Sequence, residues 1–473
     1  MKILKAQLFI LLLIFVASCS DKETNSVEIV NPIETINLPP TSDSTNIVID
    51  LSDALPISPQ IYGVNNDWVR VPRSEYTAFD IKLKEINYQL IRFPGGWESE
   101  FYDWSENTTP NFSKDTGIPG ATINDIKGKN PTKISIVVPT AIAMNEPINS
   151  NAWNTNVQKC NAEAEDAINI TGADNILSIE IGNEWWLQWG GGVSRANKLI
   201  KYANTAKLIA KNIRTKFPNA KFKVLVNGDF TNPQEFTTIR NIFSTDIDLI
   251  DGLTLHPYAG YNDPEGLYVL PNLVTSIKAC VNNLGKSYIS LSEWAPAKAY
   301  NDNQIYAEGA NLMVEQIYEF ARSGANEAAF WPPINTGIPG LGFFDTNFKI
   351  VYPTAQLFGD MALDFRGEVL KVIDGSMRGI ASRSSKGNII LYVTGKTKPS
   401  TRVKVSFSNN QKIANVVYAS LWEPGNLNNT KDAVPMKLND NPLNKLSQDK
   451  KSVSFNVNSN AKYSIYKIEL KLQ

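Results

Sequence analysis

Eight short, continuously apolar segments recur between residues 61 and 331, and longer stretches with helical spacing separate them. Uninterrupted apolar character is typical of strands that are buried on both faces of a parallel sheet. Eight strand-then-helix units predict a closed (β/α)8 TIM barrel, whereas an open doubly wound sheet would need no eighth strand. The clearest helical stretches are residues 195–217 and 304–322. The predicted strands are residues 61–65, 88–93, 133–138, 177–182, 223–227, 249–255, 288–292 and 327–331.

A different pattern begins near residue 363, where helical periodicity fades and Gly, Asn and Pro turns separate short strands. This pattern predicts a C-terminal antiparallel β-sandwich over residues 363–473. A further strand candidate within residues 46–55 precedes the barrel, which we assign to residues 56–362, and we expect it to join the sandwich. The predicted sandwich strands are residues 379–382, 388–393, 402–407, 452–457 and 463–470.

The N-terminus has a basic start followed by an apolar run at residues 6–17 that is too short to span a bilayer as a mature helix. Residues 16–19, Val-Ala-Ser-Cys, resemble a bacterial lipobox, which implies a signal peptide at 1–18 and lipidation of Cys19. A secretory signal that happens to contain a cysteine is the alternative. Residues 19–45 have the composition of a flexible tether. We therefore predict an outer-membrane lipoprotein of the bacterial cell envelope, facing the periplasm or the cell surface and touching the membrane only through this anchor.

The composition of the chain indicates which kinds of partner and cofactor it can bind. The chain has 473 residues, a formal net charge of -1, one histidine and three cysteines. A nucleic-acid partner is not expected, because basic runs are missing from the sequence. So few histidines and cysteines offer too few ligands for a metal site, and we expect no metal and no organic cofactor. Cys160 and Cys280 fall in helical stretches and are predicted to be buried free thiols, although their pairing stays open. We expect a monomer.

Two of the predicted strands end in a glutamate that tryptophan follows, namely Glu184-Trp185 and Glu293-Trp294. Catalytic side chains of such barrels lie at the carboxyl ends of the strands. The fourth and seventh strands would bring these two carboxyl groups together across the mouth of the barrel. A retaining glycosidase needs two carboxyl groups about 5 to 5.5 Å apart, one as acid and base and the other as nucleophile. The pair therefore predicts glycoside hydrolysis by double displacement.

The pattern around these strand ends resembles clan A of the retaining glycoside hydrolases. In that clan an Asn-Glu pair closes the fourth strand, a glutamate ends the seventh, an arginine ends the second, a His-x-Tyr segment follows the sixth and a tryptophan ends the eighth. The resemblance implies that Glu184 is the acid/base and Glu293 the nucleophile. It also implies carbohydrate contacts by other residues, and Trp97 and Trp185 are further aromatic candidates for stacking on a sugar. The predicted substrate-binding residues are Arg92, Asn183, His256, Tyr258, Trp331, Trp97 and Trp185.

Several families of the clan share these motifs. Arg92-Phe-Pro-Gly-Gly96 resembles the arabinofuranosidases, residues 58–65 are similar to the endoglucanase/xyloglucanase family, and residues 180–186 also resemble some agarases and porphyranases. Trp97-Glu98 departs from the arabinofuranosidase pattern, which has an Asn after the glycines. We predict a retaining hydrolase of a plant or algal polysaccharide, or of an oligosaccharide from one, with endo action. The alternatives are an exo-acting α-L-arabinofuranosidase and a surface glycan-binding lipoprotein without catalysis.

Overall fold

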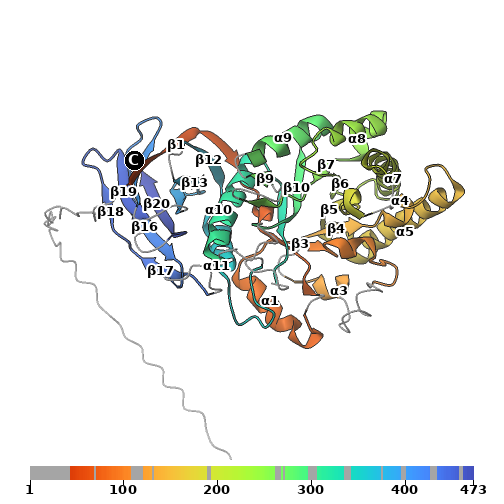
Figure 1. The fold of residues 1–473 in the computed structure, drawn as a ribbon, viewed down its shortest axis with the longest axis horizontal. Helices are drawn as coiled ribbons and strands as arrows, with labels where there is room; N and C mark the ends of the chain where they lie inside the picture. Colours follow the sequence, from red (N-terminus) through yellow and green to blue (C-terminus); the bar gives the residue numbers. More distant parts are fainter. Residues whose placement is uncertain are drawn as a thin grey trace, which may run out of the picture. The chain divides into compact units, whose positions relative to one another are not determined.

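The computed structural model (Figure 1) describes residues 43–68, 71–107, 121–129, 133–188, 193–260, 268–269, 272–296, 306–334, 342–373, 377–395, 401–426, 434–457 and 462–473. The predicted signal peptide, Cys19 and most of the predicted tether lie outside the described residues. Among the helices that are described, none combines the length and the apolar character that crossing a bilayer requires.

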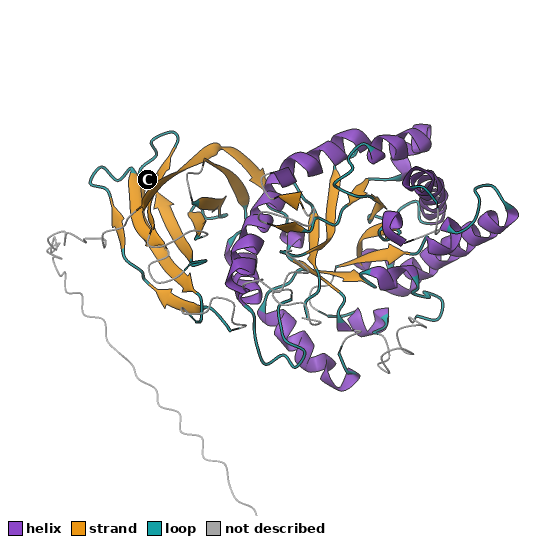
Figure 2. Cartoon of the chain, viewed as in Figure 1, coloured by secondary structure: helices purple, strands orange, loops and turns teal. Residues whose placement is uncertain are grey.

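Eight parallel strands close into a barrel, as the sequence predicts (Figure 2). The eighth strand pairs with the first through Ala329–Gly63 and Phe330–Val64, so the open-sheet alternative is wrong. Most of these strands are buried along their whole length, because helices cover the outside of the barrel and side chains fill its lumen. The strands are, in barrel order, β2 (Gly63–Asn65), β3 (Leu90–Phe93), β4 (Ile134–Val138), β5 (Ile176–Ile181), β6 (Lys223–Asn227), β7 (Gly252–Thr254), β10 (Tyr288–Trp294) and β11 (Glu327–Phe330).

Seven longer helices connect or follow the barrel strands in the described chain: α1 (Tyr76–Glu85), α5 (Asn151–Thr171), α7 (Arg195–Lys216), α8 (Glu235–Phe243), α9 (Leu273–Leu284), α10 (Tyr306–Ser323) and α11 (Pro353–Asp364). Serine side chains fix the starts of α5 and α7, since Ser150 and Ser194 accept hydrogen bonds from the first turns. Cys160 on α5 and Cys280 on α9 are buried and free, as predicted. The short helices are α3 (Ile123–Ile126), α4 (Ala141–Met144) and α6 (Trp185–Gln188), and the 3-10 helices are η1 (Pro59–Ile61), η3 (Arg73–Glu75), η4 (Trp97–Glu100), η5 (Ala173–Asn175) and η6 (Ser244–Leu249).

Ten further strands form one mostly antiparallel sheet that folds over its own core. The Phe455 and Tyr466 rings stack at 3.9 Å although their strands, β19 and β20, are far apart in the sheet order, so the sheet makes a sandwich. In order across the sheet the strands are β17 (Lys437–Asp440), β16 (Ile413–Glu423), β20 (Ile465–Leu472), β14 (Ile389–Thr394), β13 (Arg378–Arg383), β12 (Glu368–Ile373), β1 (Asp43–Pro56), β15 (Thr401–Phe407), β19 (Ser452–Val457) and β18 (Asn444–Leu446). The two short strands β8 (Ala259–Gly260) and β9 (Tyr268–Val269) pair separately.

The first described strand belongs to this C-terminal sheet. β1 pairs with β12 on one side and, in parallel, with β15 on the other. Helices α10 and α11 join the sheet to the barrel: Tyr318 donates to the carbonyl of Leu370 at 3.0 Å, and Tyr392 donates to Asp360 at 2.7 Å. The barrel core extends through these contacts into the sheet, so the strand ends that carry the site rest on a continuous packed support.

Candidate active site

The two predicted carboxyl groups meet at the carboxyl ends of the barrel strands. Glu184 follows β5, the fourth strand, and Glu293 lies near the end of β10, the seventh. A carboxylate oxygen of each residue and a ring nitrogen of His256 all lie within 4.8 Å of one another. This spacing agrees with the close pair of a retaining glycosidase and is shorter than the roughly 6.5 to 9.5 Å of an inverting one.

Arg92, at the end of β3, is the centre of the hydrogen-bond network. Its Nε donates to Glu180 at 2.8 Å, and its Nη1 donates to Glu293 at 3.0 Å and to Asn65 at 2.9 Å. Its Nη2 donates to Oδ1 of Asn183 at 2.7 Å. The guanidinium is fully buried, and the nearby carboxylates raise its pKa against the effect of burial, so its charge is permanent. A planar cation with fixed donors therefore orients four acceptors at once.

Glu293 is held at both of its oxygens. Arg92 donates to Oε2, and the hydroxyl of Tyr258 donates to Oε1 at 2.5 Å. Burial raises the pKa of Tyr258 well above its ordinary value, which keeps the hydroxyl protonated and able to donate. A cation and a hydroxyl donor both stabilise negative charge on Glu293 and fix its orientation. These contacts suit a carboxylate nucleophile.

Glu184 has a different environment. Its Oε1 lies 2.9 Å from Nδ1 of His256, whereas no described residue forms a hydrogen bond with its Oε2. Its side chain is 19% exposed, against 7% for Glu293. The free oxygen is therefore open for proton exchange with a bound molecule or with water, as a general acid and base requires.

His256, which follows β7, carries positive charge between the acids. Burial alone would lower its pKa, but Glu293, Glu180 and Glu184 raise it to about 10. Its Nε2 lies 3.1 Å from the hydroxyl of Ser292 and 3.4 Å from Glu180. Burial raises the pKa of Glu180, yet Arg92 and His256 outweigh it and bring that pKa down to about 2. Two cations, Arg92 and His256, thus lie among several acidic side chains at this site.

A tight turn after β5 presents Asn183 and Glu184. A Cβ on Gly182, which has a φ of +77°, would lie 2.7 Å from the Thr140 hydroxyl, so glycine is required there. Glu184 itself has a φ of +46°, a region that non-glycine residues seldom occupy and that is often found at functional sites. Its backbone N–H donates to the Asn227 side chain at 2.9 Å, and this contact holds the turn.

Some supporting residues were not among the sequence predictions. Glu100 is buried on η4 and accepts from the backbone N–H groups of Asn183, Thr140 and Ala141 at 2.5, 2.6 and 2.8 Å. Asn65 and Asn227 end their strands and bridge to Arg92 and Glu180, respectively. Their signal in the sequence is a polar residue that closes an apolar segment, as at Val-Asn65 and Val-Asn227.

The predicted aromatic residues separate into two groups. Trp331 follows β11, is partly exposed and lies with its ring 6.4 Å from the Tyr258 ring, and Trp97 on η4 is 49% exposed. Their sugar contacts stay predictions. The same prediction for Trp185 is wrong, because its ring is fully buried, stacks on Tyr202 at 5.5 Å and donates to the Asn227 carbonyl at 3.0 Å. Trp185 therefore stabilises the turn after β5 by packing against Tyr202 and by its hydrogen bond to Asn227.

One group of side chains in the described chain has its possible ligand atoms close enough together to hold a metal ion: Glu184, His256 and Glu293. The donor types would suit zinc. However, Arg92 lies 3.0 Å from an oxygen of Glu293 and places a permanent positive charge beside the position that a metal ion would take. The charges of this cluster fit proton transfer better than metal binding.

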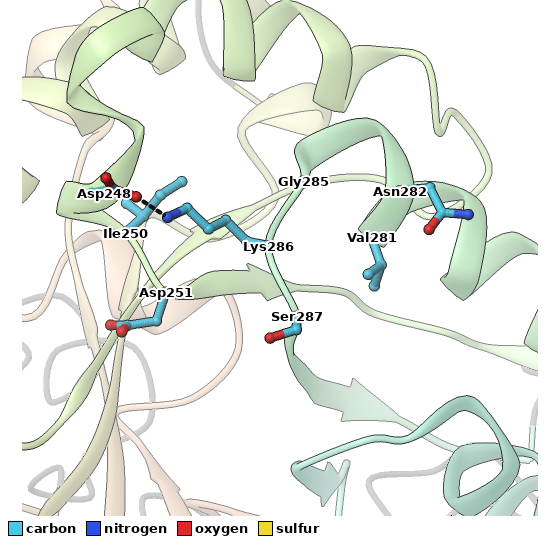
Figure 3. A pocket seen from close by; sticks show the side chains of 8 residues that line it. All are labelled: Asp248, Ile250, Asp251, Val281, Asn282, Gly285, Lys286 and Ser287. Atoms are coloured by element: carbon cyan, nitrogen blue, oxygen red, sulfur yellow. Dashed lines mark hydrogen bonds and ion pairs between the residues drawn. The ribbon is translucent and has the colours of Figure 1, made fainter.

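A hollow of about 550 Å³ lies at the other end of the barrel, where the strands begin (Figure 3). Its charged groups are already paired: Lys286 contacts Asp248 at 2.6 Å, and Asp251 contacts Arg214 and Lys223. Its lining contains no aromatic side chain, so it offers no stacking surface for a sugar. The lining residues are Asp248, Ile250, Asp251, Val281, Asn282, Gly285, Lys286 and Ser287.

No family model matches the chain, and no curated protein matches it. Among solved structures, the GH51 arabinofuranosidase from Xanthomonas axonopodis pv. citri has a TM-score of 0.63 and 14% identity, covering 90% of this chain and 100% of its own. A family 51 α-L-arabinofuranosidase from Bifidobacterium longum has a TM-score of 0.64 and 12% identity, covering 91% and 100%. A family 44 xyloglucanase from Paenibacillus polymyxa has a TM-score of 0.59 and 12% identity, also covering 91% and 100%. The likeness at these identities is one of fold.

Proposed function

We propose that this chain is a retaining glycoside hydrolase. The observation that supports this most directly is the approach of Glu184 and Glu293 to within 4.8 Å, in two environments that suit different roles. Glu293 is fixed by Arg92 and Tyr258, whereas Glu184 keeps one oxygen open. Fold alone would not carry the proposal, since one fold hosts many functions.

In the first step, an oxygen of Glu293 attacks the anomeric carbon while the bond from that carbon to the leaving oxygen breaks. Glu184 gives its proton to the leaving oxygen, which departs as an alcohol. Glu293 thereby becomes an ester of the sugar. Because Arg92 fixes Oδ1 of Asn183, the Nδ2 donor of Asn183 is left to face a sugar hydroxyl.

In the second step, Glu184 takes a proton from a water molecule, and the water oxygen attacks the anomeric carbon. The ester bond breaks, Glu293 regains its carboxylate and the sugar leaves with its original anomeric configuration. The imidazolium of His256 lies 2.9 Å from Glu184 and stabilises the negative charge that this residue carries between the two steps.

The substrate we propose is a plant or algal polysaccharide, or an oligosaccharide from one, cleaved internally. The partly exposed rings of Trp97 and Trp331 support this, because aromatic faces bind the apolar faces of sugars along a chain. We also propose that Cys19 carries lipid and holds the enzyme at the outer membrane as a monomer, on the basis of the lipobox-like residues 16–19.

An exo-acting α-L-arabinofuranosidase is the second candidate. Two observations favour it: the Arg92-Phe-Pro-Gly-Gly96 segment and the overlap in fold with two arabinofuranosidases. Release of 4-nitrophenol from the aryl α-L-arabinofuranoside, together with single arabinose units from arabinan, would support this candidate over endo action.

The test is reducing-sugar release from a panel of xyloglucan, xylan, arabinan, β-glucan, agarose and porphyran. We expect release from at least one member, and Glu293→Ala should reduce it by about 10⁴-fold or more while the fold is retained. A 2-fluoro glycosyl fluoride of the active sugar should label Glu293, and mass spectrometry of the peptide would locate the ester.

Glu184→Ala serves as the matched variant at the other carboxyl group. It should slow natural substrates strongly but aryl glycosides with acidic leaving groups much less, because these need little protonation. Full activity of Glu293→Ala, or a panel on which no substrate is cleaved, would contradict the proposed function.

A further inference from the structure

Glu100, a buried acid at the end of η4, connects three segments at the mouth of the barrel. Its Oε2 accepts from the backbone N–H groups of Thr140 and Ala141 at 2.6 and 2.8 Å. Its Oε1 accepts from the backbone N–H of Asn183 at 2.5 Å and from the hydroxyl of Thr140 at 3.2 Å. Because η4 follows β3, Thr140 follows β4 and Asn183 follows β5, one carboxyl group joins the exits of three neighbouring strands.

These contacts require a carboxyl group at position 100. Burial raises the pKa of Glu100, and its hydrogen bonds offset the rise only in part. In either protonation state both oxygens accept from backbone N–H groups, since among these partners only the Thr140 hydroxyl could take a proton back. A glutamine has one acceptor oxygen and an NH2 group that only donates. At this position its nitrogen would have to face a backbone N–H.

The turn that Glu100 holds also carries the acid/base carboxyl group. Glu184 directly follows Asn183 and has a φ of +46°, a conformation that persists only where the surroundings enforce it. Its own backbone N–H donates to Asn227, which ends β6, at 2.9 Å. Two successive N–H groups of the turn are thus fixed by residues that belong to strands on either side of β5 in the barrel.

The nucleophile is held by other contacts. Arg92 and the hydroxyl of Tyr258 donate to the two oxygens of Glu293. Arg92 contacts the turn through Asn183 in one hydrogen bond, and three further bonds hold its guanidinium in place. A change at Glu100 should therefore displace Glu184 and leave Glu293 where it is.

We propose that Glu100 is a positioning residue that fixes the backbone of Asn183 and thereby directs the carboxyl group of Glu184 toward the leaving oxygen. This inference rests on the proposed function and adds to it a residue that acts only through Glu184. Placement matters because a shift of about 1 Å in a reacting group can cost on the order of 100-fold in rate.

The test follows two reactions of Glu100→Gln and of the unchanged enzyme. Cleavage of the polysaccharide that the panel identifies needs a proton from Glu184, whereas labelling of Glu293 by the 2-fluoro glycosyl fluoride of its sugar does not, because fluoride leaves without one. We expect kcat/KM for the polysaccharide to fall about 10- to 100-fold and the rate of labelling to change less than about threefold.

The variant should lose one specific contact. Its amide oxygen can keep the two bonds to Thr140 and Ala141, which leaves the NH2 group against the N–H of Asn183. A general disturbance of the site would slow cleavage and labelling equally. Equal reductions would therefore overturn the inference, and so would unchanged cleavage.

Glu163→Gln is the matched control. Glu163 is a partly buried acid on α5 whose Oε2 accepts from the backbone N–H of Trp104 at 2.7 Å, so an amide oxygen can replace it. This variant undergoes the same chemical change without disturbing the turn, and both reactions should proceed at the rates of the unchanged enzyme. If it reproduced the effect of Glu100→Gln, the contact to Asn183 would not be the cause.

A nuclear magnetic resonance experiment tests the contact without a substrate. Labelling with carbonyl-13C glycine and 15N asparagine selects Gly-Asn peptide bonds, which occur at residues 182–183, 387–388 and 425–426. Asn183→Asp removes the signal of residue 183 and so assigns it. The Asn183 amide should be protected from hydrogen exchange, with protection at least about tenfold lower in Glu100→Gln. Fast exchange in the unchanged enzyme would refute the inference even if the variant failed to fold.

The two measurements also separate this inference from the proposed function. If Asn183 loses protection in Glu100→Gln but no polysaccharide of the panel is cleaved, the proposed hydrolysis fails and the hold of Glu100 on the turn stands. If the panel contains a substrate and Glu100→Gln cleaves it as fast as the unchanged enzyme, the positioning role fails and the hydrolysis stands.

Discussion

The barrel encloses a buried glutamate near each end, and the two differ in their neighbours. Glu180 on β5 contacts Arg92 at 2.8 Å and His256 at 3.4 Å, and its pKa falls to about 2. Glu327 starts β11 and accepts from the hydroxyl groups of Ser178 and Ser135 at 2.6 and 2.9 Å. Burial raises the pKa of Glu327, and the hydroxyl contacts offset this only in part.

The comparison shows that a buried carboxyl group does not by itself mark a reactive site. Desolvation acts on both residues, and what decides their charge is the presence of a cation. Arg92 and His256 lie in the site where the strands finish, and they keep Glu180 ionised there. The neighbours of Glu327 are neutral hydroxyl groups, which fit the interior of the barrel.

The largest expected effect comes from removing the cation at the reactive end. Arg92→Leu would leave Glu180 and Glu293 buried without their partner, and we expect a loss of roughly 3 to 5 kcal/mol in the free energy of unfolding. Denaturant unfolding measures this. Arg73→Leu is the control, because Arg73 pairs with Asp125 at 3.0 Å on the surface and should lose less than about 1 kcal/mol. Equal losses would contradict the comparison.

His256→Gln tests the second cation. We expect kcat/KM at pH 7 to fall about 10- to 100-fold, because a charged hydrogen bond worth roughly 1.5 to 3 kcal/mol to Glu184 is lost. Since the pKa of His256 is raised to about 10, its charge persists below that pH and is lost as the pH rises through it. The parent should therefore lose activity on the alkaline side in a step that the variant lacks. Identical pH profiles would show that the imidazolium does not contribute.

Glu327→Gln tests the protonation of the buried Glu327 side chain. The raised pKa means that the folded chain keeps a proton that the unfolded chain releases above about pH 4.5, its ordinary value. The stability of the parent should therefore fall relative to the variant as the pH rises above 4.5, by on the order of 1 kcal/mol at pH 8. Below pH 4.5 the difference should disappear. Thermal unfolding across this range measures it, and a difference that is independent of pH would refute the assignment.

The smallest effect is expected at the hollow where the strands begin. Lys286→Ala removes an ion pair with Asp248, which is 91% exposed, so the loss should be under about 1 kcal/mol with kcat/KM unchanged. A strong loss of activity in this variant would reveal a link between the two ends that the contacts do not indicate.

Sequence patterns predicted the barrel well, because each strand is a compact apolar run that tertiary packing does not disturb. They predicted the sheet less completely. β16 carries register shifts between Ile413 and Asn415 and between Val416 and Tyr418, which break the alternation that identifies a strand. β17 is exposed along its whole length and so has no apolar face to recognise. β12 and β18 also went unpredicted.

The site divides in a similar way. Residues within conspicuous motifs, such as Arg92, Asn183 and Glu293, could be picked out and are brought together by the fold. Glu100 could not, because its role depends on backbone N–H groups from two other segments. Trp185 misled for a related reason: a tryptophan after a strand can face the mouth or turn back into the wall, and only packing against Tyr202 decides which.

β1 has a consequence for how the chain must be made. Its residues 43–56 precede the barrel in the chain, yet its partners β12 and β15 begin only at residues 368 and 401, after the barrel. Both edges of β1 therefore stay unpaired while the whole barrel is synthesised. Pairing between segments so far apart in the chain is slow. A nascent chain therefore cannot complete this sheet until residues 368–407 have been synthesised, and an unpaired strand is open to wrong partners until then.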